Sequence, residues 1–183
     1  NLHLGGGEPS ASPPGGATHT NLPEEVVADL DAALAHARAV LDFWPIAYYP
    51  YMYRSANGFR VECRRADADV DAAWRAVCDL AAGANRDGEF VVYPGFEWQG
   101  DGRHGDHNVF FADDHPPILP SGTLPELYAD IRRRGLRAFA IPHHTAYRAG
   151  VRGKDWSVHD EALSHFAEIF SSHGSSESDE EWI

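Results

Sequence analysis

Short apolar runs alternate with helix-like segments along most of this chain, and this alternation limits the possible folds more than any other feature. Apolar residues at helical spacing occupy three segments, 21–40, 67–84 and 123–134. Runs typical of strands occupy 1–4, 41–49, 90–95, 107–112, 136–141 and 167–170. Strands that alternate with helices of this length are typical of parallel β/α units. Reactive groups of parallel barrels gather at the carboxyl ends of the strands, so we expect an α/β fold with its site there.

Length and charge narrow the class of protein. The 183 residues suffice for one domain with its own core, and we expect a single domain over 1–183. Within it, residues 5–20 are rich in Gly, Pro and Ser and predict a mobile loop. A net charge of -13 argues against a nucleic-acid partner, which would require a basic face. No apolar run approaches the roughly 20 residues that span a bilayer, so we expect a soluble chain without a membrane partner, the cytoplasm being slightly favoured.

Several histidines and one glutamate stand within or just after the predicted strands. They are His3, Glu97, His107, His143, His144 and His173. If the strand ends meet at one barrel face, these side chains form a cluster that suits a divalent ion such as Zn, Mn or Fe. We expect Glu97, His107 and His143 to share one metal site. The alternative for each histidine is an ordinary hydrogen-bonded structural role.

Two histidines stand side by side directly after Pro142. Side chains alternate between the two faces of a strand, so we expect only one of His143 and His144 to face the metal. The other, His144, then contacts the substrate or orients its neighbour.

Five motifs occur in a fixed order along the chain. They are Asn1-Leu-His3, Leu41-Asp-Phe-Trp-Pro-Ile-Ala47, Pro94-Gly-Phe-Glu-Trp98 with Gly105-Asp-His-Asn108, Ile141-Pro-His-His144 and Ser171-Ser-His-Gly-Ser-Ser-Glu177. In this order they resemble segments of PHP-like (polymerase and histidinol phosphatase) metal-dependent hydrolases, closest to a large uncharacterised group of them. The resemblance implies a distorted (β/α)7 TIM-like barrel with metal ions at its strand ends. It also implies that His3, Glu97, His107 and His143 are metal ligands.

The chain departs from this family pattern in three places. Gly5 stands where the family has the second histidine of an opening His-x-His, and Tyr48 and Tyr49 stand where it has Asp-His. A late Asp-x-His pair belongs to a strand that this chain does not reach. We therefore expect one or two divalent ions rather than three. We also expect only the N-terminal part of a barrel, completed by the same gene product or by another chain.

The resemblance implies a metal-dependent hydrolase, with a phosphoester as the first expectation for the substrate. A metal ion lowers the pKa of bound water, and His144 or His173 would protonate the leaving group. One alternative is a carbohydrate-active or other non-phosphate metalloenzyme. Another is a domain that binds a metal ion or a small molecule without turnover.

Cationic and aromatic side chains near these motifs are candidates for substrate binding. They are Arg103, Arg148, Arg152, Lys154, Tyr48 and Tyr49. Guanidinium groups bind phosphate or carboxylate through paired hydrogen bonds, so an anionic small molecule is one expected substrate class. The tyrosines, which lead into a predicted tyrosine-rich loop, suit stacking on a sugar or an aromatic ring. The alternatives are a solvated loop for the basic residues and a packed segment for the tyrosines.

Overall fold

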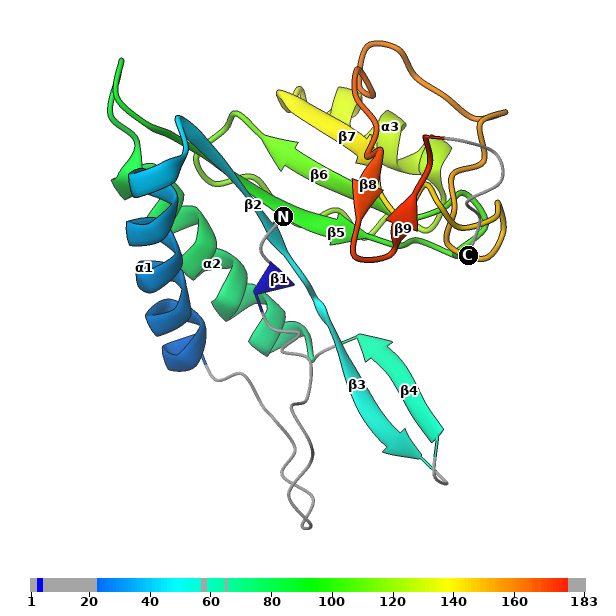
Figure 1. Cartoon of the computed structure of the whole chain (residues 1–183), viewed down its shortest axis with the longest axis horizontal. Coiled ribbons are helices and arrows are strands. Elements are labelled where there is room, and N and C mark those ends of the chain that lie inside the picture. The colour runs from blue at the N-terminus through cyan, green and yellow to red at the C-terminus, as the bar shows by residue number, and fades with distance from the viewer. Residues whose placement is uncertain (1–2, 5–22, 57–58, 65, 178–183) are drawn as a thin grey trace. The chain divides into compact units, whose positions relative to one another are not determined.

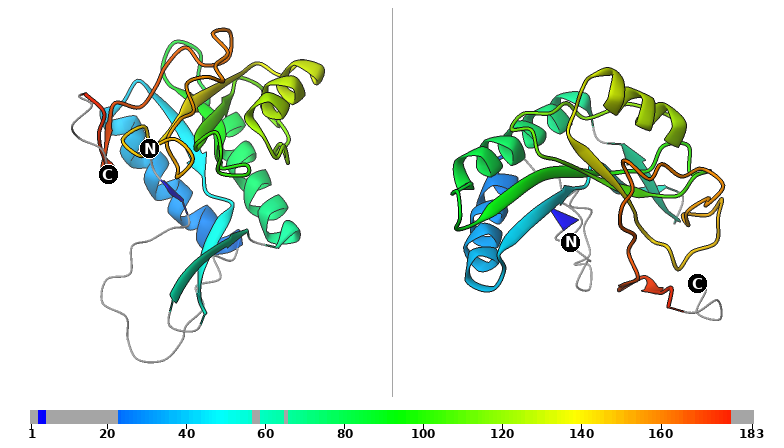
Figure 2. Two further views of the ribbon diagram at one scale, coloured as in Figure 1. Left: turned by 90° about the vertical axis from the view of Figure 1, so that its right-hand side faces the viewer. Right: turned by 90° about the horizontal axis from the view of Figure 1, so that it is seen from above.

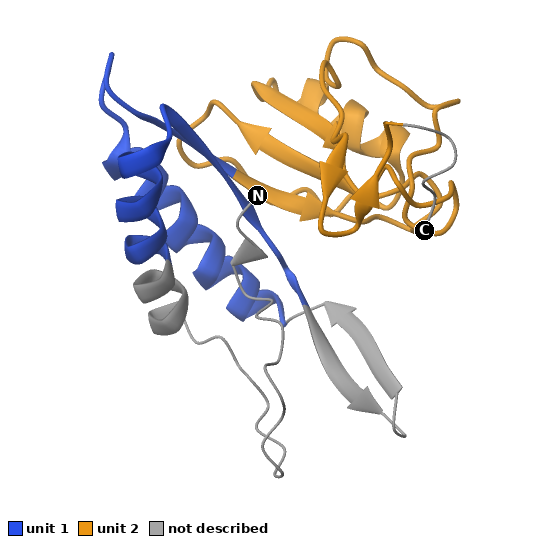
Figure 3. Ribbon diagram, in the orientation of Figure 1, with its two compact units in different colours: residues 1–94 blue, residues 95–183 orange. Residues whose placement is uncertain are grey.

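The computed structural model describes residues 3–4, 23–56, 59–64 and 66–177, with side chains over 30–51 and 66–177. The chain divides into two compact units, Asn1–Pro94 and Gly95–Ile183 (Figure 3). Strand β5 (Val91–Trp98) begins in the first unit and ends in the second. The loop predicted at 5–20 lies outside the described residues.

Two helices and a pair of parallel strands make up most of the first unit. Helices α1 (Pro23–Val40) and α2 (Asp67–Ala84) lie side by side and contact β2 (Phe43–Tyr48) (Figure 1). Strand β1 (His3–Leu4) runs parallel to β2. The buried residues of α2 recur three or four positions apart, which places them along one side of the helix. They are Val70, Ala73, Trp74, Val77, Cys78, Ala81 and Ala84.

A β-hairpin follows β2 in the first unit, where the sequence predicts a tyrosine-rich loop. Strand β3 (Tyr51–Ala56) pairs antiparallel with β4 (Phe59–Arg64). The loop prediction is therefore wrong. The helices predicted at 21–40, 67–84 and 123–134 are confirmed, the last as α3 (Leu124–Arg133). Among the helices in the described ranges, none combines the length and the apolar character needed to cross a bilayer.

The strands of the second unit run antiparallel. The last half of β5 pairs with β6 (His107–Phe111), and β6 pairs with β7 (Ala138–Pro142). The loop 99–106 between β5 and β6 contains no helix and is shorter than the roughly dozen residues that a parallel crossover requires. An antiparallel pairing is therefore the only one that this connection allows.

This strand arrangement contradicts the predicted (β/α)7 barrel. The hydrogen-bonded strand order is β1-β2-β5-β6-β7, the sheet is mixed, and the described residues form no closed barrel. The barrel prediction fails because it treats 90–95 and 107–112 as successive β/α strands, although no helix-like segment separates them. The strand predicted at 167–170 is also mostly wrong, because β8 (Phe170–Ser171) begins only at the last of these residues. It pairs antiparallel with β9 (Gly174–Ser175).

The strand segments of the second unit have one apolar face. Successive side chains along a strand point to opposite faces, and the register places four buried aromatic and aliphatic residues on the same one. They are Phe96, Trp98, Val109 and Phe111. The Trp98 indole N–H donates to the Ser121 carbonyl oxygen at 2.8 Å, just before α3 begins. Helix α3 covers this face (Figure 2), and its buried residues Leu124, Leu127, Tyr128 and Ile131 add to the core.

The opposite face of these strands, called the polar face below for the residues of the candidate site, also carries the apolar side chains of Phe110 and Ile141. The register pairs Glu97 with Asn108 there, and both side chains are buried. The β8–β9 hairpin lies on this side of the strands, away from α3 (Figures 1 and 2). The candidate site lies on this polar face.

Candidate metal centre

The end of β7 brings both adjacent histidines to the polar face. The His143 N–H donates to the Asp106 carbonyl oxygen at 2.8 Å and so extends the strand pairing by one residue. His144 then adopts a left-handed backbone conformation with φ of 56°, where strand alternation no longer applies. The two imidazole centroids lie 3.7 Å apart as a result. The expectation that only one of the pair faces the site is therefore wrong.

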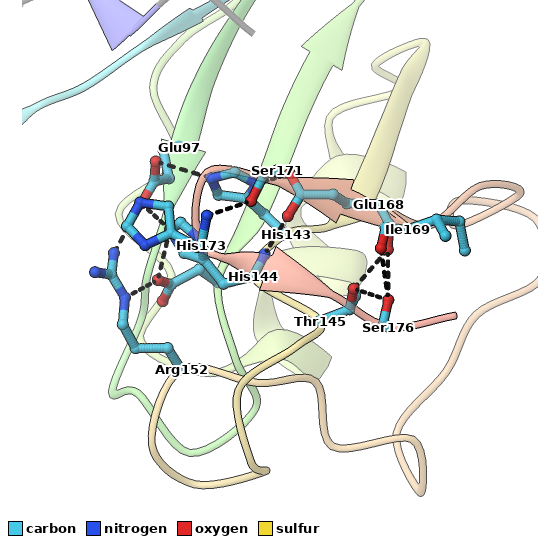
Figure 4. A network of polar contacts seen from close by, with 11 residues as sticks. Glu97, His143, His144, Thr145, Arg152, Glu168, Ile169, Ser171, His173 and Ser176 are labelled. Carbon is cyan, nitrogen blue, oxygen red and sulfur yellow. Dashed lines mark hydrogen bonds and ion pairs between the residues drawn. The ribbon is translucent and has the colours of Figure 1, made fainter. Parts of the chain in front are cut away.

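Glu97, His143 and His144 form a buried group that could hold a metal ion. One candidate ligand atom from each lies within 4.8 Å of the others. His143 Nε2 is 3.7 Å from Glu97 Oε2, and His144 Nε2 is 4.0 Å from Glu97 Oε1 (Figure 4). Ligand bonds of about 2.0–2.2 Å in tetrahedral geometry place donor atoms on the order of 3.4 Å apart. Small inward movements of the three side chains would therefore suffice to coordinate an ion.

Other charged groups surround Glu97. The Arg152 Nη2 group donates to Glu97 Oε1 at 3.4 Å, and its Nε group donates to Asp106 Oδ2 at 2.7 Å. Asp106 Oδ2 also lies 3.9 Å from His144 Nε2. Burial raises the pKa of Glu97 to about 7, against the opposing influence of His143. An added cation would compensate this burial and favour the ionised form of Glu97.

Glu168 is a functional candidate that the sequence does not reveal. Its Oε2 atom lies 2.6 Å from His143 Nδ1, and its Oε1 atom accepts the His144 backbone N–H at 3.1 Å (Figure 4). Burial acts to raise the pKa of Glu168, but its hydrogen bonds with His143, the His144 N–H and Ser171 act in the opposite direction, and the pKa is lowered. Glu168 stands in a predicted strand, and Asp106 stands beside one and within the motif Gly105-Asp-His-Asn108; these were the signals that could have singled them out.

His173 lies beside the group on the turn between β8 and β9. Its ring meets that of His144 edge to face, with centroids 4.3 Å apart. Its Nδ1 atom is 3.2 Å from the Tyr147 hydroxyl, and the side chain is partly exposed. The structure therefore brings the two predicted catalytic histidines, His144 and His173, next to each other.

The structure does not bring His107 into this group. His107 pairs with Trp98, so its side chain points to the apolar face, where the two rings lie 5.8 Å apart. Its Nδ1–H donates to the Gly105 carbonyl oxygen at 3.0 Å. Burial and the Lys154 cation lower the pKa of His107 to about 3. His3 belongs to β1 of the first unit, and its side chain is outside the described ones.

The predicted substrate-binding residues lie in different surroundings. Arg152 contacts Glu97 and Asp106, whereas Lys154 is buried and donates to the Val158 carbonyl oxygen. Arg103 and Arg148 are exposed loop residues. Tyr48 and Tyr49 are buried in the first unit, next to Trp74 and Tyr51 respectively. For the two tyrosines, this burial agrees with the alternative of a packed segment.

Two glycines let the loops that carry Asp106 and Arg152 approach each other. Gly105 has a φ of 80°, and a Cβ atom there would lie 2.4 Å from the Gly153 carbonyl oxygen. A Cβ atom on Gly153 would lie 1.7 Å from the Tyr147 carbonyl oxygen. This close approach allows the Asp106 N–H to donate to the Arg152 carbonyl oxygen at 2.9 Å.

Comparison of the chain with known protein families, curated proteins and solved structures finds no match. The resemblance to PHP-like hydrolases therefore stays a prediction, and the barrel that it implied is contradicted by the strand order.

Proposed function

We propose that this chain is a metal-dependent hydrolase that holds one divalent transition-metal ion between Glu97, His143 and His144. Its substrate is an ester, with a phosphoester as the first choice. The observation that carries the proposal is the convergence of two imidazoles and one carboxylate, from β5 and from the turn after β7, in a buried group. The described residues contain one such group, which supports one ion rather than two.

The donor set matches the proposed ion. Neutral imidazole and carboxylate bind Zn, Mn and Fe, whereas Mg and Ca prefer oxygen donors alone. A buried carboxylate is unfavourable without a compensating cation, and Glu97 has one oxygen directed at each histidine. A bound ion would compensate the carboxylate more completely than the Arg152 contact at 3.4 Å does.

The number of protein ligands supports catalysis over a structural role. Structural zinc sites use four protein ligands, while catalytic ones use three and leave a position for water or substrate. When bound, such an ion supplies Lewis acidity and lowers the pKa of a coordinated water toward neutrality. His173, partly exposed and 4.3 Å from the His144 ring, is placed to give a proton to the leaving group.

Arg152 supports an anionic substrate. About a quarter of its side chain is exposed (24%), while its Nε and Nη2 groups hold Asp106 and Glu97. A guanidinium fixed in this way places positive charge at the edge of the metal site, where phosphate oxygens would bind.

Metal content is the first test. Chelator-treated protein is dialysed against Zn²⁺, Mn²⁺ or Fe²⁺, and the bound metal is counted by mass spectrometry. We expect one ion per chain in the wild type, and a strong loss in Glu97→Gln and His143→Ala. Glu161→Gln and His159→Ala change exposed loop residues and should leave metal content unchanged. A wild-type chain that binds none of these ions contradicts the proposal.

Turnover is the second test. The metal-loaded protein is assayed with p-nitrophenyl phosphate, bis(p-nitrophenyl) phosphate, p-nitrophenyl acetate and p-nitrophenyl glycosides. We expect phosphoester hydrolysis that disappears in Glu97→Gln. Hydrolysis of only the acetate or a glycoside would favour the non-phosphate enzyme, and stoichiometric metal without any turnover would favour a non-catalytic binding domain.

A further inference from the structure

One carboxylate contacts both of the adjacent histidines. Glu168 Oε2 lies 2.6 Å from His143 Nδ1, and Oε1 accepts the His144 backbone N–H at 3.1 Å. Its side chain is 15% exposed, and that of His143 is 3% exposed. The carboxylate therefore contacts both candidate ligands, one through each oxygen, and it also has a hydrogen bond with the Ser171 side chain.

The first contact fixes which nitrogen of His143 faces Glu97. An ionised carboxylate only accepts hydrogen bonds, so the Nδ1 atom of His143 must carry the hydrogen. The Nε2 atom, 3.7 Å from Glu97 Oε2, is then the one with a lone pair for a metal. Metal-binding histidines commonly donate their second ring N–H to a carboxylate in this way.

The second contact fixes the backbone that carries the other imidazole. His144 has a φ of 56°, a left-handed conformation that few residues other than glycine adopt, although histidine is enriched among those that do. The hydrogen bond from its N–H to Glu168 helps to hold this turn in place. Glu168 is itself anchored, because its N–H donates to the Pro142 carbonyl oxygen at 3.1 Å and its own carbonyl oxygen accepts from Thr145.

We infer that Glu168 is a positioning residue that sets the tautomer of His143 and the turn at His144, and thereby tunes metal affinity at the site. The inference rests on the proposed metal function. Glu168 does not itself join the Glu97, His143 and His144 group. Removing it should weaken metal binding by roughly 10- to 100-fold without abolishing it.

The tautomer of His143 can be measured without metal. In chelated wild-type protein with ¹⁵N-labelled histidine, assigned with His143→Gln, we expect hydrogen on Nδ1 and none on Nε2. Hydrogen on Nε2 in place of Nδ1 in the wild type would overturn the inference, whatever the variants do. Glu168→Ala should shift His143 toward a mixture of tautomers, and an unchanged Nδ1–H tautomer in this folded variant also counts against the inference.

Zinc titration then separates positioning from simple packing. Glu168→Gln keeps one acceptor oxygen but sets an amide N–H against one of the two donors. The expected order of zinc affinity is wild type, then Glu168→Gln, then Glu168→Ala, with Glu161→Gln equal to wild type. Equal affinities in all four proteins overturn the inference but leave the metal site standing. Absence of zinc binding in the wild type removes the proposed function, while the tautomer of His143 still decides the role of Glu168.

Discussion

The backbone of His144 is where the site departs most from regular structure. Its φ of 56° lies in the left-handed region, where a Cβ atom approaches the following carbonyl oxygen and costs roughly 1–2 kcal/mol. The pairing of the two imidazoles depends on this conformation, since regular strand geometry would direct them to opposite faces.

Alanine variants are usually more stable than glycine variants, and we expect this order of stability to be reversed at His144. His144→Gly should be more stable than His144→Ala by about 0.5–1 kcal/mol, because glycine adopts positive φ without steric strain. Urea unfolding of both variants in chelator measures the difference. A more stable alanine variant would show that this residue is not held in the left-handed region.

His107 predicts a dependence of stability on pH. Burial and Lys154 lower its pKa in the folded chain from 6.5 to about 3, so the folded state binds fewer protons than the unfolded one. The contribution of neutral His107 is complete above pH 6.5 and is lost as the pH falls from there toward 3. At pH 5 the loss from this residue is about 2 kcal/mol.

His107→Asn tests this dependence, because the asparagine amide can still donate to the Gly105 carbonyl oxygen but does not titrate. Between pH 7.5 and pH 5, this variant should lose less free energy of unfolding than the wild type. The exposed His159→Asn variant is the control and should follow the wild type. Parallel curves for His107→Asn and the wild type would mean that the pKa of His107 is the same in the folded and unfolded chains.

Among the elements, the loops beside the candidate metal site depend on close backbone contact. A methyl group on Gly153 would overlap the Tyr147 carbonyl oxygen, which belongs to the backbone and has little room to move. The loop also carries Arg152, so any displacement changes the contacts with Glu97 and Asp106.

Gly153→Ala should destabilise the chain by at least about 2 kcal/mol and weaken zinc binding as well. Gly83→Ala is the matched control, since Gly83 lies in the last turn of α2 with no atom near its missing Cβ. That change should stabilise the chain by roughly 0.5–1 kcal/mol. Thermal and urea unfolding compare the two, and equal effects would contradict the close packing at Gly153.

Most helices and strands were predictable from the sequence, but the pairing and direction of the strands were not. Apolar spacing identified α1, α2 and α3, because a helix is a local structure whose buried residues recur every three or four positions. Strand direction depends on distant pairing, and the short loop between β5 and β6 was the sequence signal that should have excluded a parallel crossover. The β3–β4 hairpin was missed although the sequence carries a signal for it, because Asn57-Gly58 stands between two strand-like runs, and such a dipeptide is typical of hairpins.

The candidate site was predictable only in part, because local sequence patterns do not determine how distant strands pair. Glu97 and His143 were expected together because each stands at the end of an apolar run. His107 was expected with them, but a one-residue offset in register turns its side chain to the α3 side. Glu168 and the left-handed turn at His144 depend on tertiary contacts, so sequence spacing alone does not reveal them.

For the whole molecule, metal binding should appear as added stability. A ligand that binds only the folded state stabilises it by about 2.7 kcal/mol at a concentration 100 times its dissociation constant. We expect zinc to raise the urea midpoint of the wild type and chelator to reverse this, with no response in His143→Ala. An equal zinc effect in that variant would place the bound ion elsewhere on the chain.

Successive side chains of β5 point to opposite faces, so an error in its register would affect the core and the candidate site together. Glu97 and Trp98 are neighbours in the chain, yet Glu97 lies on the face of the candidate site and Trp98 lies in the apolar core under α3. A register shift of one residue would place the Glu97 carboxylate in the apolar core and the Trp98 indole among the charged groups of the candidate site. Packing Trp98 correctly under α3 therefore also places Glu97 on the face of the candidate site, whereas the turn at His144 still depends on its own contact with Glu168.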